Sequence, residues 1–410
     1  MKKLIYAGTL LIFVCMTTAC GQDFAFPQIV NNSKATLNDM TCYKTFEEFA
    51  YTNFIQSSEK WLPTEPWQIQ AKMPNKYLGD SAYWDVQLVR YVNDDPEIWF
   101  RGWSGNKNDD TNILIYHPHS RRWTPISDVV EKSDISVQEL YLTKDGTVWG
   151  RNYWNKERKN TPDRGSILSK YNEQTNQFEF VPEVFQVPFA NEEKYSSTNV
   201  LFDDVNNVFW IGIEPDGLYT YDPNIDKTTK QASLQNMSVG TLGSATDGTI
   251  FFTNLIEEPE YPSFAPENLY EGFLMRFSPE GNEFIALEVP DKPWPKLGLP
   301  IVTKSDFLWI GAVGYLDLNS NRWNLLVEPS DYYVGGYLSW PTSPYVILED
   351  GSGIVWFRLA SEQRGGGMAW LDPKTGEGCM FTNIPAKIVE DDRQQLWMFA
   401  DGKLYRYALE

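Results

Sequence analysis

Three arginines with aromatic side chains beside them are the residues of this sequence that could recognise a ligand. A guanidinium binds carboxylates with paired hydrogen bonds, and the flat rings of Trp and Tyr can stack on a sugar or another flat ligand. Each arginine lies two residues after a Trp that recurs along the chain. The predicted ligand-binding residues are Arg101, Trp103, Arg151, Tyr153, Trp154 and Arg358. The alternative is that each arginine pairs with a nearby carboxylate and the rings cover loop backbone.

The sequence contains few residues that could support catalysis, metal binding or cofactor binding. There are only two histidines, His117 and His119, and four cysteines. The chain therefore has few residues for histidine-based catalysis and few ligands for a zinc cluster. The sequence contains no phosphate-binding loop, dinucleotide fingerprint or G-x-S-x-G motif. We therefore expect no metal and no cofactor. A polysaccharide lyase or hydrolase stays an open alternative, because the separation of two catalytic carboxylates cannot be read from a sequence.

The charge balance excludes one class of partner. The chain has 35 Lys and Arg against 55 Asp and Glu, a formal net charge of −20. A surface this acidic repels phosphate backbones, so nucleic-acid binding is not expected. The aromatic share of 15% favours β-structure, because flat bulky side chains pack well on pleated surfaces.

The first twenty residues are typical of an export signal. Met1-Lys2-Lys3 is a short basic start, and the apolar run from Leu4 to Met16 is about 13 residues, below the ~20 that a membrane-spanning helix needs. The stretch from Thr17 to Gly21 resembles the lipobox of bacterial lipoproteins, in which small residues precede a cysteine that becomes lipidated. The resemblance implies a signal peptide over 1–19, a lipid on Cys20, and a protein at the cell surface or periplasmic face. Lipid would be its only membrane anchor.

Once Cys20 is lipidated, two cysteines remain outside the signal region, Cys42 and Cys379. Disulfides persist in the compartments that exported proteins reach, so these two residues are a possible pair. The alternative is two separate buried thiols, since a bridge requires a geometry that the sequence does not supply.

A repeat occupies most of the chain. A turn cluster rich in Asp, Asn and Gly precedes an apolar residue and then Trp or Phe, roughly every 40 to 60 residues. The seven aromatic positions are Trp99, Trp149, Trp210, Phe251, Trp309, Trp356 and Trp397. Each cluster predicts a hairpin, and a third and usually a fourth apolar run follow it. Four antiparallel strands at this period predict an all-β fold, a β-propeller of seven blades. The alternative is six, if the fourth unit, with Phe251 in place of Trp, is degenerate.

The last unit ends without a fourth strand, which would leave an open edge in the ring. The alternating segment from Pro66 to Ala71 can supply that strand, as propellers generally do when they close. We therefore predict one propeller domain over 65–410. The segment 20–64 is predicted to be a tether with a short helix around Tyr43 to Ala50.

One stretch of the repeat resembles a known family. Asp204 to Gly212, followed by Gly217 to Pro223, is similar to the two-component regulator propeller repeat, in which D-x-x-G-x-h-W-h-G leads to G-L-x-x-Y-D. The resemblance implies a propeller fold and, in that family, periplasmic ligand sensing. This chain shows no kinase domain beside the repeats.

These observations predict a function of binding at the cell envelope without catalysis. Long connections between the second and third strands of the blades would form the binding face, and the three arginines would make a positive focus there. The expected partner is a glycan, an anionic small molecule or an envelope protein, and we expect a monomer. The alternatives are the enzyme named above and an envelope scaffold.

Overall fold

The computed structural model divides into two compact units, Met1–Lys34 and Ala35–Glu410. All residues that the structure describes belong to the second unit, and everything below concerns that unit. The described residues are 40–43, 67–78, 83–103, 112–128, 130, 136–153, 167–181, 198–213, 217–232, 239–254, 274–278, 283–287, 300–310, 314–325, 345–359, 367–375, 378–382, 387–400 and 402–407.

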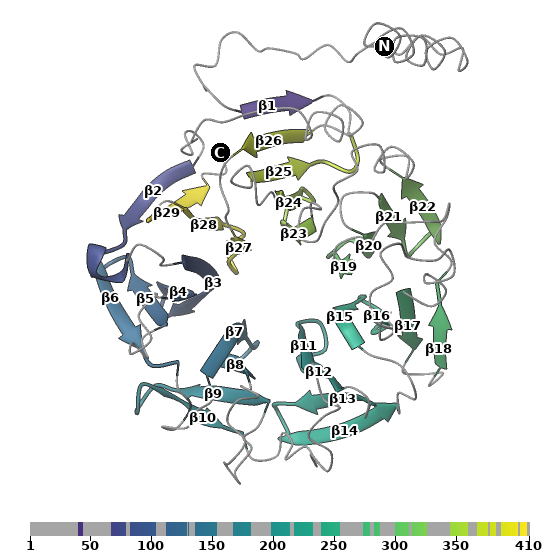
Figure 1. Cartoon of the computed structure of the whole chain (residues 1–410), viewed down its shortest axis with the longest axis horizontal. Helices are drawn as coiled ribbons and strands as arrows, with labels where there is room; N and C mark the ends of the chain where they lie inside the picture. The colour runs from purple at the N-terminus through teal and green to yellow at the C-terminus, as the bar shows by residue number, and fades with distance from the viewer. Residues whose placement is uncertain are drawn as a thin grey trace, which may run out of the picture. The chain divides into compact units, whose positions relative to one another are not determined.

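Seven antiparallel sheets form the blades of a β-propeller, as Figure 1 shows. Blade 1 contains β3 (Tyr83–Val92), β4 (Asp95–Trp103), β5 (Ile113–His117) and β6 (Arg122–Ile126). Blade 2 contains β7 (Ser136–Leu142), β8 (Val148–Tyr153), β9 (Leu168–Asn172) and β10 (Gln177–Phe180). Blade 3 contains β11 (Thr198–Asp203), β12 (Val208–Ile213), β13 (Gly217–Asp222) and β14 (Lys227–Ala232). Blade 4 contains β15 (Val239–Ser244), β16 (Ile250–Asn254), β17 (Leu274–Ser278) and β18 (Glu283–Ala286). The predicted number of seven is confirmed, since the unit with Phe251 forms a full blade.

The last three blades include two strands from the N-terminal part of the chain. Blade 5 contains β19 (Pro300–Val302), β20 (Phe307–Ile310), β21 (Gly314–Asp317) and β22 (Arg322–Leu325). Blade 6 contains β23 (Tyr345–Glu349), β24 (Val355–Leu359), β25 (Gly367–Leu371), β26 (Gly378–Thr382) and the added β1 (Met40–Tyr43). Blade 7 contains β27 (Ile388–Glu390), β28 (Leu396–Ala400), β29 (Lys403–Tyr407) and β2 (Trp67–Lys72). A short 3-10 helix, η1 (Asn75–Tyr77), follows β2.

The predicted closing strand is confirmed. β2 pairs antiparallel with β29, with Trp67 opposite Tyr407 and Lys72 opposite Lys403. Blade 7 thus joins a segment before the first blade to the last strand of the chain. β1 is a strand that the sequence did not suggest: the helix predicted around Tyr43 to Ala50 begins at the last residue of β1, and 44–50 lie outside the described residues.

The first turn of every blade needs a residue in the left-handed backbone region. A positive φ occurs at Asn93 and Asp94, Gly146, Asn207, Gly248, Asp306, Gly353 and Gln394. Most of these are the Asn, Asp and Gly residues of the predicted turn clusters, which adopt this conformation at low cost. The strand that precedes each turn is the innermost of its sheet, as Figure 1 shows for β3 and β7.

The core lies between neighbouring blades. All seven aromatic residues of the repeat are buried. One cluster joins Trp356 and Met368 of blade 6 to Leu396 and Tyr405 of blade 7, and others repeat this arrangement around the ring. A cluster of buried apolar side chains thus lies between each pair of neighbouring blades.

Candidate functional site

The two faces of the ring differ in the length of their connections. On one face lie the turns from first to second strand in every blade and from third to fourth strand in blades 1 to 6. These turns are short, and the longest joins Leu371 to Gly378. On the other face, β16 ends at Asn254 and β17 begins at Leu274, and β22 ends at Leu325 before β23 begins at Tyr345. We call these the short-turn face and the long-loop face. Binding residues are typically carried by long loops on a rigid scaffold.

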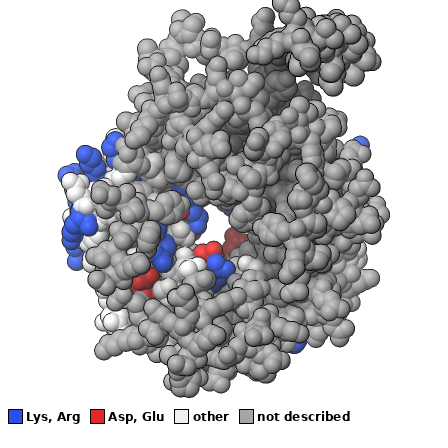
Figure 2. Space-filling model, in the orientation of Figure 1, with Lys and Arg blue, Asp and Glu red and all other residues white. Residues whose placement is uncertain are grey.

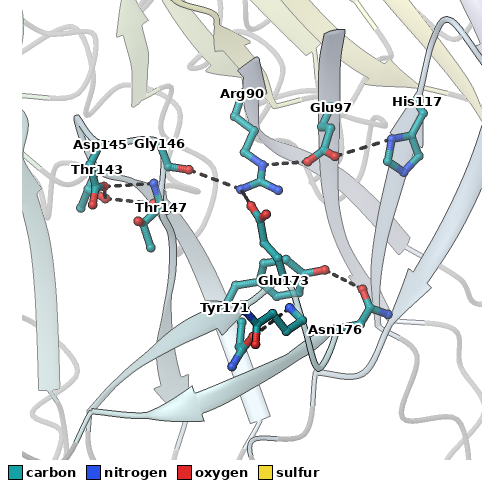
Figure 3. Close-up of polar contacts among 12 residues, drawn as sticks. Arg90, Glu97, His117, Thr143, Asp145, Gly146, Thr147, Tyr171, Glu173 and Asn176 are labelled. Atoms are coloured by element: carbon teal, nitrogen blue, oxygen red, sulfur yellow. Dashed lines mark hydrogen bonds and ion pairs between the residues drawn. The ribbon is translucent and has the colours of Figure 1, made fainter. Parts of the chain in front are cut away.

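The short-turn face is held together by polar contacts from blade to blade. In each contact the donor belongs to the turn region of one blade and the acceptor to that of a neighbour. These contacts, donor first, are Arg90 with Gly146, Lys144 with Val205, Thr246 with Asp306, Ser305 with Glu349, Gly351 with Glu390, and Arg393 with Asp94. Four carboxylates, those of Asp94, Asp306, Glu349 and Glu390, therefore link neighbouring blades. Figure 3 shows the contacts of Arg90 and of the neighbouring turn.

Three buried aspartates also bind the repeat tryptophans. The indole Nε1 donates to the carboxylate in the pairs Trp210 with Asp203, Trp356 with Asp350 and Trp397 with Asp391, at 3.4, 2.8 and 2.8 Å. The aspartate lies six or seven residues before the Trp, at the start of the turn. Its other oxygen accepts from backbone N–H groups of the same turn, so one carboxylate orders both the turn and the core residue.

Replacing Asp350 with asparagine should lower the free energy of unfolding by about 1–3 kcal/mol, because a charged acceptor for a buried indole is lost. Asp247 is the matched control: it is exposed, it accepts the backbone N–H of Thr249, and the ring of Phe251 has no N–H that could donate to it. Urea denaturation of both variants tests the difference. Equal losses in Asp350→Asn and Asp247→Asn would show that the indole contact contributes nothing.

Arg101 lies on β4, at its long-loop end, and has several partners. Its Nε donates to the carbonyl oxygen of Val137 on β7 at 2.7 Å, and its Nη2 lies 3.3 Å from the carboxylate of the buried Asp128. It also donates to the carbonyl oxygens of Gly102 and Asn112. Burial lowers the pKa of Arg101 below its usual value, and the charge of Asp128 partly offsets this. Arg101 thus links blade 1 to blade 2 through its hydrogen bond to Val137.

Arg151 lies at the corresponding position of β8 and is more accessible. Its Nη2 lies 3.1 Å from Oε1 of Glu139 on the innermost strand β7, with side-chain exposures of 22% and 45%. Glu139 Oε2 accepts the hydroxyl of Tyr141 at 2.7 Å. Burial raises the pKa of Tyr141 well above its usual value, and the charge of Glu139 adds to the shift. The site therefore has a partly exposed cation and anion side by side.

The other predicted ligand-binding residues are placed only in part. Arg358 lies on β24, opposite Tyr345 and Met368, and Trp103 and Tyr153 are the last residues of β4 and β8. All three occupy the long-loop ends of second strands, one strand away from the axis. Trp154 and Cys20 lie outside the described residues. Figure 2 shows a hollow at the centre of the ring with positively and negatively charged side chains at its edge.

Irregularities on the innermost strands are a feature that sequence reasoning missed. The register shifts between Val86 and Leu88 on β3, and between Val137 and Glu139 on β7. Gln87 lies at the first shift and accepts a hydrogen bond from Lys387 of blade 7 at 3.1 Å. Bulges redirect side chains and are common beside binding sites.

The described residues include no group of His, Cys, Asp and Glu that could hold a metal ion. His117 lies 3.1 Å from the hydroxyl of Thr124 and 3.7 Å from Glu97, while His119 contacts Asp95. Burial lowers the pKa of His117, and the charge of Glu97 opposes that effect. Within the part of the chain described, no helix has the length and hydropathy that crossing a membrane requires.

The described carboxyl groups with a shifted pKa belong to turns. Burial raises the pKa of Asp145, but hydrogen bonds from Thr143 and Thr147 outweigh it and hold the pKa below its usual value. A hydrogen bond from Ser320 lowers the pKa of Asp317. A general acid needs the opposite shift, so neither residue favours a glycosidase.

Comparisons with known proteins find similarity among solved structures. No family model matches the sequence, and no curated protein matches it. Among solved structures, YCF48 bound to D1 peptide is similar with a TM-score of 0.49 and 11% identity over 86% of this chain and 98% of that chain. An extracellular domain from B. thetaiotaomicron, assigned to a hybrid two component system, has a TM-score of 0.47 and 13% identity over 79% of this chain. This chain covers 40% of that domain. A structural genomics protein of unknown function from B. thetaiotaomicron has a TM-score of 0.42 and 13% identity over 84% of this chain and 76% of that one. The likeness is one of fold.

Proposed function

We propose that this protein is an exported, lipid-anchored propeller that binds an anionic glycan or another anionic small ligand with its long-loop face, without catalysis. The observation that carries the proposal is the asymmetry of the two faces. Polar side chains of the short-turn face are engaged between blades, whereas the long connections between successive strands from β3 to β29 start and end at the opposite face. The connection from β1 to β2 is the exception, because Tyr43 and Trp67 both lie at the short-turn ends of their strands. A rigid ring with long loops on one face is an arrangement suited to recognition.

Arg151 is the residue we expect to contact the ligand. Its guanidinium is partly exposed and paired with the half-exposed Glu139, so a ligand carboxylate can replace this partner at little cost in desolvation. Arg101 is a positioning residue, because its acceptors are carbonyl oxygens of blades 1 and 2 and a buried carboxylate. The two arginines thus have different roles although they occupy equivalent strands.

The proposed location rests on the first twenty residues. Their basic start, apolar core and terminal Cys20 fit a lipoprotein signal. The mass of the N-terminal peptide, measured on protein recovered from the cell envelope, tests this part: a diacylated or triacylated Cys20 supports it, and an unmodified N-terminus overturns it.

The expected result for the site is a loss of ligand affinity in Arg151→Ala. Uronate-containing oligosaccharides should raise the melting temperature of the wild-type chain, because they bind only the folded state. Arg151→Ala should bind them about 10–100-fold more weakly, the effect of removing one charge-assisted hydrogen bond. Thermal shift and titration calorimetry measure both quantities, with neutral oligosaccharides for comparison.

Arg393→Ala is the matched control, since Arg393 also forms a partly exposed ion pair, with Asp94 at 2.8 Å, but on the short-turn face. It should keep wild-type affinity. The proposed site is wrong if both variants bind alike, and the proposed ligand class is wrong if no acidic oligosaccharide binds the wild-type chain.

A further inference from the structure

The N-terminal strand β1 brings two distant cysteines to facing positions. β1 pairs antiparallel with β26 as the outermost strand of blade 6. In this register Cys42 lies directly opposite Cys379, between the pairs Thr41 with Met380 and Tyr43 with Gly378. Two cysteines far apart in the sequence thus occupy one cross-strand pair.

This backbone placement suits a disulfide. Directly opposed residues of antiparallel strands have Cα atoms about 4.5 or 5.5 Å apart, depending on whether the pair is hydrogen-bonded. A disulfide requires a Cα separation of about 4.4–6.8 Å, so either kind of pair satisfies it. Opposed residues also project from the same face of a sheet, which brings their Cβ atoms together.

We propose that Cys42 and Cys379 form an intrachain disulfide, an inference that rests on the export included in the proposed function. Oxidation proceeds by thiol–disulfide exchange with a disulfide-bearing oxidant of the export compartment. The two cysteines lose two protons and two electrons as their sulfur–sulfur bond forms, and the disulfide of the oxidant is reduced to two thiols.

The bond has a mechanical consequence because of the order of the strands. A lipid on Cys20 would transmit tension first to β1 and then to β2, the strand that closes the ring. Without a covalent link, the short β1 could be pulled from β26 and the tension would then act on β2. The disulfide fixes the chain to blade 6 before β2 and so protects the closing strand.

A peptide map without reduction tests the proposal. The full chain, recovered from the envelope of exporting cells, is blocked with N-ethylmaleimide in denaturant at low pH and digested with trypsin. We expect residues 35–44 and 375–387 to be recovered as one linked species, which separates into two peptides on reduction. Recovery of both peptides alkylated would overturn the proposal. An acylated Cys20 in that same sample would show that export had occurred and that only the disulfide inference had failed.

A register variant gives the matched control. The double substitution Thr41→Cys with Cys42→Ser moves the thiol opposite Met380, so its side chain projects from the other face of the sheet. We expect no linked peptide from this variant and full alkylation of Cys379. An equal yield of linked peptide would show that pairing occurs in the unfolded chain, and the structural inference would be wrong.

Discussion

Replacing Trp67 with alanine should lower the free energy of unfolding by about 3–5 kcal/mol, the cost of removing a large buried aromatic side chain. Trp67 lies on the closing strand β2 and is 4% exposed. Its ring makes edge contacts with Trp356 of blade 6 and Tyr407 of blade 7, with centroid distances of 6.0 and 5.0 Å. One side chain therefore joins the closing strand to two blades. The shift in the midpoint of urea denaturation measures the loss.

Ile69 provides the control for this prediction. It lies two residues further along the same strand, opposite Tyr405, but is 59% exposed. Ile69→Ala should change the free energy of unfolding by no more than about 0.5 kcal/mol. If Trp67→Ala is as mild as Ile69→Ala, then β2 does not contribute to the stability of the ring.

The repeat was predictable because its signals are local. A residue that tolerates positive φ, an apolar residue and an aromatic residue occur in a short stretch in each blade. Within a blade, from β3 onward, consecutive strands of the chain pair with each other. The closing strand was predictable because the repeat showed only three strands in the last blade, so another segment had to supply the fourth. β1 was not predictable in this way, because its partner β26 is distant and the four residues Met40–Tyr43 carry no alternating pattern.

The side-chain contacts of the site were less predictable than the strand positions of its residues. Placing Arg101 and Arg151 on equivalent strands required only the repeat. Their different environments depend on Asp128, which follows β6, and on Glu139 of β7, so they follow from the packing of one blade against another. The aspartate–indole pairs did carry a sequence signal, an Asp six or seven residues before Trp, but turn formation alone accounted for those aspartates.

Replacing Arg90 with alanine should destabilise the ring by about 3–5 kcal/mol, because it leaves a buried carboxylate without its cation. Arg90 Nε donates to Glu97 Oε2 of β4 at 2.7 Å, and both side chains are largely buried. Its guanidinium also lies over the ring of Trp99, 5.3 Å from the centroid. The second ion pair, with Glu173 of blade 2 at 2.9 Å, contributes less because Glu173 is mostly exposed. Figure 3 shows Arg90 between these two carboxylates.

The double variant Arg90→Met with Glu97→Gln separates charge from packing. It removes the cation and the buried anion together and keeps apolar volume over Trp99, so it should recover at least half of the stability that Arg90→Ala loses. Urea denaturation of the wild type, of Arg90→Met, of Glu97→Gln and of the double variant gives the coupling energy between the two residues. Additive losses from Arg90→Met and Glu97→Gln would mean that the two residues act independently. In that case the ion pair within blade 1 would not stabilise the ring, and the loss in Arg90→Ala would come from the contacts of Arg90 with Trp99 and with Gly146 and Glu173 of blade 2.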